Sequence, residues 1–162
     1  PVSGAHFNPI VTLAFVVRGD MPIKRAGAFI AAQIFGAIAG VLLTHAMFDQ
    51  SLFQLSQTSR TGAPLWISEI FASFGLLLII FGGLAQNSKA IASMVALYIT
   101  GAYWFTASTS FANPAVSIAR ALSDTFAGIY PAHVPMFILC QLIGMALALV
   151  VVRIVYDRQT GG

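Results

Sequence analysis

The sequence predicts an all-α membrane protein: a bundle of membrane-spanning helices with two short half-membrane helices, arranged as an inverted repeat. Composition is the first observation, because 58% of the 162 residues are hydrophobic, 8% are charged and the mean hydropathy is +0.86. So much apolar material exceeds what a soluble core of this length can bury. The second observation is that Asn-Pro occurs twice at the start of a short apolar stretch.

Charge and cysteine content exclude several classes of protein. The net charge is +3 and the isoelectric point is about 9.5. The eight basic residues lie singly between apolar runs, so they form no patch for a nucleic-acid partner. The one cysteine, Cys140, lies within an apolar run and predicts neither a disulfide framework nor a redox motif.

Four segments are long enough to cross a hydrocarbon core of about 30 Å, which takes roughly 20 helical residues. They cover approximately 25–48, 64–85, 89–108 and 134–156. Small residues recur at four-residue spacing in the first and last of these segments, at Ala32, Gly36, Gly40, Gly144 and Ala148. This spacing lets helices approach closely, so we expect the helices to pack against each other through it.

The two Asn-Pro stretches, about 8–18 and 113–123, are too short to span a bilayer and predict re-entrant half-helices. Three predicted spans separate them, so they enter the membrane from opposite faces, which is the pattern of an inverted repeat. With the first Asn-Pro loop on the cytoplasmic side, Arg60 and Arg120 fall outside. The other basic residues fall inside, as the positive-inside rule requires: Arg18, Lys24, Arg25, Lys89, Arg153 and Arg158.

The two halves of the sequence match each other residue by residue. At an offset of 105 positions the matched pairs are Asn8 with Asn113, Pro9 with Pro114, Val11 with Val116, Thr12 with Ser117 and Ala14 with Ala119. The following helices match at an offset of 108, with the segment 33–36 against 141–144. Because two spans precede the second motif, the repeat predicts two further helices, roughly 60 residues, before the first motif. Residues 1–162 would form a single channel domain.

The Asn-Pro pair has a clear physical role at a helix start. Proline suits the first helical position because that N–H has no partner inside the helix. Asparagine before it caps the helix through its side-chain oxygen, and its NH₂ group remains as a donor. Two such helices meeting at the midplane, each with about half a positive charge at its N-terminus, would repel cations and accept neutral solutes. The sequence therefore predicts a water-bearing channel in which Asn8 and Asn113 orient the solute.

These residues resemble those of the aquaporin and glycerol-facilitator (major intrinsic protein) family. Its paired Asn-Pro-Ala motifs are similar to Asn8-Pro9-Ile10 and to Asn113-Pro114-Ala115, and the first departs from the family pattern at Ile10. The resemblance covers essentially the whole chain and lacks the family's first two helices. It implies an aquaporin-like helical bundle, a homotetramer with one pore per subunit, and no cofactor.

The resemblance also implies a selective constriction near the outer mouth of the pore. Its positions correspond to Gly101, Ser110 and Val116, and the fourth would lie in the absent second helix. Water-selective members have histidine at the first of these positions and arginine at the last. Glycine and valine widen the opening and remove donors, so glycerol-like polyols and metalloid acids are expected to pass with water. The valine is similar to that of a bacterial subgroup associated with arsenic resistance, which implies permeation by arsenous acid.

Arg120 leaves an alternative open. It lies four residues after Val116, on nearly the same helical face, so its side chain could serve the constriction and make the channel water-selective. It could instead pair with Asp124, which we expect.

Other polar residues have two interpretations each. Glu69 is the one acidic residue well inside a predicted span; it could serve a proton-coupled transporter, whereas the resemblance implies that it braces the re-entrant loop. We expect His6 to brace its loop or line the pore rather than bind a metal, because no second ligand stands at metal-binding spacing. His45 and His133 lie at segment ends and are expected at the membrane interface.

The sequence favours a channel over an enzyme, since it has no nucleophile triad, phosphate loop or carboxylate pair. An ion-coupled secondary transporter and a non-conducting scaffold are the rival classes. The expected partners are small neutral solutes, water and a lipid bilayer. Short loops fit a multi-pass protein of a bacterial inner membrane.

Overall fold

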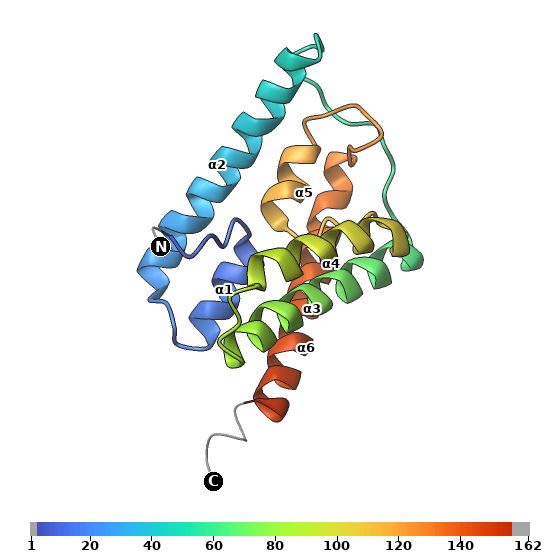
Figure 1. Cartoon of the computed structure of the whole chain (residues 1–162). Helices are drawn as coiled ribbons and strands as arrows, with labels where there is room; N and C mark the ends of the chain where they lie inside the picture. Colours follow the sequence, from blue (N-terminus) through green and yellow to red (C-terminus); the bar gives the residue numbers. More distant parts are fainter. Residues whose placement is uncertain (1–2, 157–162) are drawn as a thin grey trace. The chain divides into compact units, whose positions relative to one another are not determined.

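The computed structural model describes residues 3–156, and all regular elements in that range are helical (Figure 1). In chain order they are α1 (Pro9–Val17), α2 (Ile23–Met47), α3 (Ala63–Ala85), α4 (Ile91–Phe105), α5 (Pro114–Arg120), a 3-10 turn (Pro131–His133) and α6 (Val134–Val155). The all-helical class predicted from the sequence is confirmed. Arg158, which contributed to the predicted orientation, lies outside the described residues.

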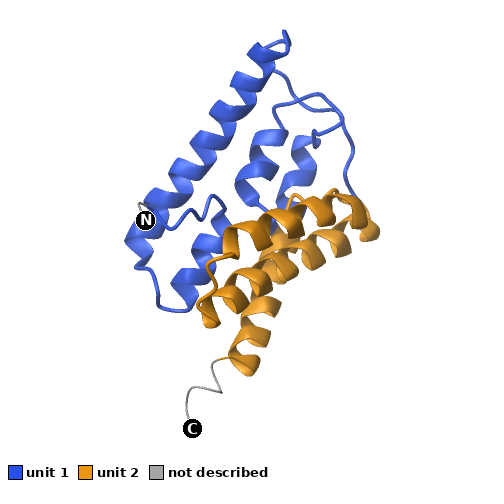
Figure 2. Cartoon of the chain, viewed as in Figure 1, with its two compact units in different colours: residues 1–61, 113–138 blue, residues 62–112, 139–162 orange. Residues whose placement is uncertain are grey.

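The chain divides into two compact units (Figure 2). Unit 1 combines residues 1–61 with 113–138 and holds α1, α2, α5 and the start of α6. Unit 2 combines residues 62–112 with 139–162 and holds α3, α4 and the rest of α6. The single channel domain over residues 1–162 stays a prediction.

Three described helices are long and apolar enough to cross a membrane: Ile23–Met47, Ala63–Ala85 and Pro131–Val155. The fourth predicted span covers residues 89–108, whereas the helix observed there, α4, has only 15 residues. The helix ends where Thr106 adopts an extended backbone with φ −105° and ψ 140°. The next backbone N–H, that of Ala107, donates to Ser68 Oγ at 3.1 Å instead of continuing the helix. That this segment crosses the membrane stays a prediction.

The two short helices begin where the Asn-Pro motifs place them. α1 fits the predicted stretch 8–18, whereas α5 stops at Arg120 rather than at residue 123. Tight turns close its end, with the Leu122 N–H donating to the Ala119 carbonyl at 3.0 Å. Both helices are too short to span a bilayer, as predicted.

In unit 1, α2 contacts both α1 and α5. Only Ala26 and His45 of α2 are buried, and a methyl group added at Gly36 or Gly40 would meet nothing within 4 Å. The predicted packing through the small residues of α2 is therefore absent among residues 3–156, because no described helix lies over them.

In unit 2, the small residues of α6 do allow a close approach. A Cβ atom at Gly144 would collide with the Ile70 carbonyl oxygen of α3 and would lie 2.9 Å from the Ser73 Cβ. The neighbouring helices α3 and α4 also contact each other, and the Tyr98 hydroxyl donates to the Ala72 carbonyl at 3.1 Å. The prediction of close packing is confirmed at Gly144.

Candidate functional site

The first Asn-Pro pair starts α1 as a capped helix. The backbone of Asn8 is extended, and its Oδ1 accepts a hydrogen bond from the Ile10 N–H at 3.0 Å. Pro9 occupies the first helical position, where a missing N–H costs no hydrogen bond. Asn8, Pro9 and Ile10 are all buried. Ile10, which departs from the motif, is 0% exposed.

The second Asn-Pro pair starts α5 in the same way and also contacts the first loop. Asn113 Oδ1 accepts from the Ala115 N–H at 3.0 Å and from the Val116 N–H at 3.4 Å. Its Nδ2 donates to the Phe7 carbonyl oxygen at 2.9 Å. Since Phe7 directly precedes Asn8, this bond joins the starts of the two short helices. One amide thus caps its own helix and holds the opposite loop.

The loops that lead into the two helices have the same unusual backbone. Positive φ angles occur at Gly4, Ala5 and Phe7, and again at Thr109, Ser110 and Ala112. Each of the second three lies 105 positions after one of the first, the offset of the Asn-Pro motifs. Five of the six are not glycine, and a non-glycine residue in this region costs of order 1 kcal/mol or more. The repeat seen in the sequence therefore extends to a strained backbone pattern.

Glu69 of α3 holds the second of these loops. Its side chain is 0% exposed, and its oxygens accept from the Phe111 N–H at 2.8 Å and the Ala112 N–H at 2.9 Å. Gln141 Nε2 of α6 donates to the same carboxylate at 2.7 Å. Charged acceptors make the stronger class of hydrogen bond, and an unpaired buried carboxylate would be very costly. Three N–H donors thus occupy the group that a proton-coupled transporter would need.

His6 lies in the first loop, in a cluster with α1 and α2. Gln33 Nε2 donates to Thr12 Oγ1 at 2.9 Å, and His6 Nδ1 lies 3.2 Å from the same hydroxyl. Thr12 Oγ1 therefore links the side chains of His6 and Gln33. The ring also stacks on Phe15, with centroids 4.4 Å apart. These contacts place His6 as part of the loop support.

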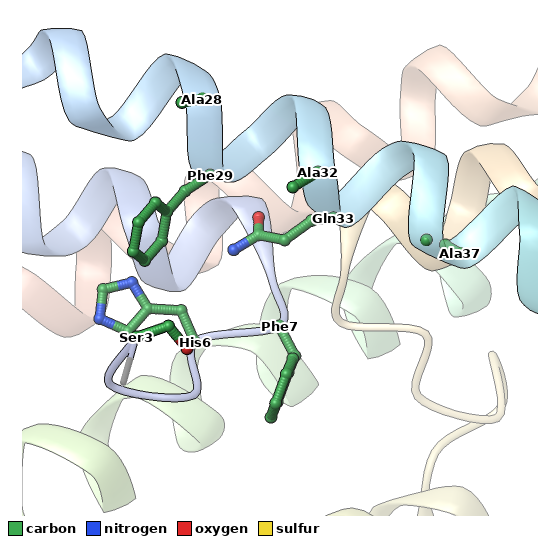
Figure 3. A pocket seen from close by; sticks show the side chains of 9 residues that line it. Ser3, His6, Phe7, Ala28, Phe29, Ala32, Gln33 and Ala37 are labelled. Carbon is green, nitrogen blue, oxygen red and sulfur yellow. The ribbon is translucent and has the colours of Figure 1, made fainter. Parts of the chain in front are cut away.

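A cavity of about 530 Å³ adjoins this cluster. Figure 3 shows Phe29 and Gln33 projecting from α2 toward the loop that carries His6 and Phe7. Small residues of α2, including Ala32 and Gly36, form much of its wall. Among residues 3–156, no group of three His, Cys, Asp or Glu side chains could hold a metal ion here or elsewhere.

The predicted constriction residues fall in different units. Gly101 in α4 and Ser110 in the loop after it belong to unit 2, whereas Val116 in α5 belongs to unit 1. Ser110 is 6% exposed, and no described group accepts from or donates to its hydroxyl. Val116 is half-buried, one turn into α5. That these three residues form one constriction stays a prediction.

Comparison with known proteins identifies the family. Residues 1–108 match the family described as Major intrinsic protein. The chain belongs to the major intrinsic protein family. It is 48% identical, over 94% of its length, to aquaglyceroporin AqpS of Rhizobium meliloti (strain 1021), of which the match covers 66%.

Two further relatives are more distant. The chain is 33% identical over 90% of its length to Aquaporin-1 of Rhizopus delemar, of which the match covers 60%. It is 35% identical over 75% of its length to lens fiber major intrinsic protein of Lithobates pipiens, of which the match covers 50%. The chain thus spans between half and just under two thirds of the length of these relatives.

Several polar residues of this family member have roles that sequence reasoning missed. His45 is 2% exposed, and its ring nitrogens contact the Leu52 carbonyl at 3.0 Å and Ser123 Oγ at 3.1 Å. His133 accepts from the Arg60 N–H at 3.1 Å. That His45 and His133 lie at the membrane interface stays a prediction, whereas their hydrogen-bond partners could not be predicted from hydropathy. In the parts of unit 1 between positions 50 and 123, Arg60 and Arg120 are the two charged residues. The position of Arg60 as an isolated charge in a polar loop was the sequence feature that could have indicated its role.

The expected partner of Arg120 is engaged elsewhere. Asp124 Oδ1 accepts from the Gln57 N–H at 2.8 Å, and the Asp124 N–H donates to Gln54 Oε1 at 2.9 Å. The carboxylate therefore caps a neighbouring loop. The i+4 spacing from Arg120 did not decide its partner because α5 ends before Asp124.

Proposed function

We propose that this family member is a passive transmembrane channel for small neutral solutes, including water. The observation that carries the proposal is the meeting of two capped Asn-Pro helix starts, joined by the bond from Asn113 Nδ2 to the Phe7 carbonyl oxygen. An amide NH₂ group has two N–H donors, so Asn113 can hold the loop with one and orient a solute with the other. The positive ends of two helix dipoles disfavour cations.

The solutes we propose are glycerol-like polyols and metalloid acids such as arsenous acid, with water. Gly101, Ser110 and Val116 are small or apolar at the proposed constriction, so they leave the opening wide and poor in donors. The relative of highest identity among those named above is called an aquaglyceroporin, which supports this choice. No cofactor is required for passive permeation.

A water-selective channel is the second candidate, with Arg120 serving the constriction. Arg120 ends α5, one turn beyond Val116 on nearly the same face. An ion-coupled transporter is less well supported because three N–H groups already occupy the Glu69 carboxylate.

The test is stopped-flow light scattering on proteoliposomes that contain the full-length protein, with water, glycerol and arsenous acid. We expect wild type to pass all three, and Val116→Arg to lose glycerol and arsenous acid while keeping water. Val116→Leu is the matched control, since it adds volume without donors. Passage of water alone by wild type would reject the wide pore and favour the Arg120 alternative.

We also propose a homotetramer with one pore per subunit, in a bacterial inner membrane. The rhizobial relative supports a bacterial source, and the three long apolar helices support a multi-pass arrangement. Mass measurement of the detergent-solubilised protein by multi-angle light scattering would test the tetramer.

A further inference from the structure

Two loops of unit 1 that lie far apart in sequence are joined along their length. One is the segment 54–60, between α2 and α3, and the other is the segment 121–133, which follows α5. Three hydrogen bonds from backbone N–H groups run between them: Ser56 N–H to the Ala121 carbonyl at 2.9 Å, Gln57 N–H to the side-chain Asp124 Oδ1 at 2.8 Å, and Tyr130 N–H to the Thr58 carbonyl at 2.8 Å. The segment 54–60 thus lies alongside the other loop and is hydrogen-bonded to it at several positions.

Arg60 ends this segment as a buried cation. It is 9% exposed, and its guanidinium donates from Nε to the Gly128 carbonyl at 2.7 Å and from Nη2 to the Phe126 carbonyl at 2.8 Å. Its backbone N–H donates to His133 Nδ1 at 3.1 Å. The planar guanidinium reaches two carbonyl groups at once, which the single ammonium of lysine does less well. Arg60 therefore holds the loop 126–133 through three hydrogen bonds, to Phe126, Gly128 and His133.

The contact between the loops requires a residue without a side chain. A Cβ atom at Gly128 would collide with the Ser123 carbonyl oxygen and with Ser56 Oγ. Ser56 is itself 0% exposed. This close approach is an observation independent of the Arg60 hydrogen bonds, and it places the segment 54–60 directly against the turn after α5.

The helix that these loops hold is α5, which has only seven residues. So short a helix is not stable on its own, and its last carbonyl groups have no partners inside it. The Ile129 N–H donates to the Arg120 carbonyl at 3.3 Å, and the Ser56 N–H takes the next carbonyl, that of Ala121. The other end of α5 is held by Asn113 and its bond to Phe7. Val116 lies between the two fixed ends.

We propose that Arg60 is a positioning residue for α5 and thereby a determinant of solute selectivity, although it lies outside the predicted constriction. The role in selectivity rests on the channel function proposed above. Arg60 holds the loop 126–133 and the segment 54–60 together, and these fix the end of α5. Loss of the guanidinium removes two of the bonds that hold the loop 126–133, so the end of α5 is less firmly fixed and the position of Val116 is less closely set.

The test compares wild type with Arg60→Leu and Arg60→Lys in the full-length protein. The first measurement is hydrogen–deuterium exchange of the amides of residues 117–130. Arg60→Leu removes the guanidinium hydrogen bonds to Gly128 and Phe126, and the loss of one charge-assisted bond alone corresponds to about a tenfold change. We therefore expect exchange there to accelerate by about tenfold or more, and amides of α3 to change by less than about twofold. Arg60→Lys retains the charge and can donate in one direction, so its exchange rates should lie between those of wild type and Arg60→Leu.

The second measurement is the ratio of glycerol to water permeability in proteoliposomes. We expect this ratio to change by about threefold or more in Arg60→Leu and to stay within about twofold of wild type in Arg60→Lys. Arg153→Leu is the matched control, because Arg153 is exposed near the end of α6 and its loss should change neither readout.

The outcomes separate this proposal from the proposed function. Unchanged exchange at residues 117–130 in Arg60→Leu overturns the positioning role, and faster exchange with an unchanged permeability ratio overturns the role in selectivity. If wild type passes no solute, the channel function fails, whereas the exchange data still decide whether Arg60 positions α5. Should Arg60→Leu not fold, Thr58→Val removes the single bond from Thr58 Oγ1 to the Thr125 carbonyl at 3.0 Å and should raise exchange less, over the same residues.

Discussion

At the residue scale, Asn113 divides its side-chain amide between a local and a distant task. The oxygen of Asn113 accepts from its own helix and the nitrogen donates to the Phe7 carbonyl oxygen. Aspartate would keep the first task and lose the second, whereas alanine would lose both. The two substitutions therefore separate helix capping from loop holding.

Asn113→Ala should lower the free energy of unfolding by about 1 kcal/mol from the lost cap alone. Asn113→Asp should retain most of that stability, because a carboxylate also caps a helix start. Thermal unfolding in detergent, followed by circular dichroism, measures both. Equal losses in the two variants would show that the cap is not the source of the stability.

A second residue-scale prediction concerns Glu69. Glu69→Gln replaces two charged acceptor oxygens by one neutral oxygen and one donor, so at least one buried N–H of the loop loses its partner. We expect a loss of about 2 kcal/mol or more in stability. Gln141→Leu removes one donor and leaves the two backbone bonds to Glu69, so its loss should be smaller. The order of the two melting temperatures tests this interpretation, and the reverse order contradicts it.

At the element scale, the capped starts of the helices were predictable and their ends were not. Asn and Pro act within one turn, so the sequence alone places the starts of α1 and α5. The ends of α4 and α5 depend on bonds to other elements, such as Ala107 N–H to Ser68 Oγ and Ser56 N–H to the Ala121 carbonyl. Those partners lie tens of residues away, and no local pattern names them.

Among the helices, close packing can be tested at one glycine. Gly144→Ala puts a methyl group against the α3 backbone and should cost about 1–3 kcal/mol. Gly27→Ala in α2 is the matched control, since its added methyl group meets nothing within 4 Å and alanine favours a helix by up to about 1 kcal/mol. Melting temperatures of the two variants should therefore move in opposite directions.

At the scale of the whole molecule, the membrane class and the repeat could be read from composition and motif spacing. The candidate site was predictable to the extent that it consists of the repeated motif. The loop network around Arg60 and His45 was not, because hydrogen bonds such as that between His45 and Ser123 join residues 78 positions apart. Polar residues in loops give little indication of such partners.

For the whole protein we predict that solute flux does not depend on an ion gradient. A passive pore has no step that an ion must drive. The Glu69 carboxylate, which a coupled transporter would need, is already hydrogen-bonded to three N–H donors. Glycerol uptake into proteoliposomes, measured with and without a proton ionophore and a sodium gradient, should agree within error. Uptake that stops when the gradient is dissipated would indicate a secondary transporter instead.

The shared left-handed pattern of the two loops has a consequence for engineering. Gly4, Ala5 and Phe7 share positive φ angles with Thr109, Ser110 and Ala112, so we expect the first loop to accept the side chains of the second without a change of main chain. A chimera carrying Thr-Ser-Phe-Ala at positions 4–7 should keep its helix start at Pro9, because Asn8 is unchanged, and should lose the contact of His6 with Thr12. Such a graft would use the internal repeat as a means of redesigning one loop of the molecule from the other.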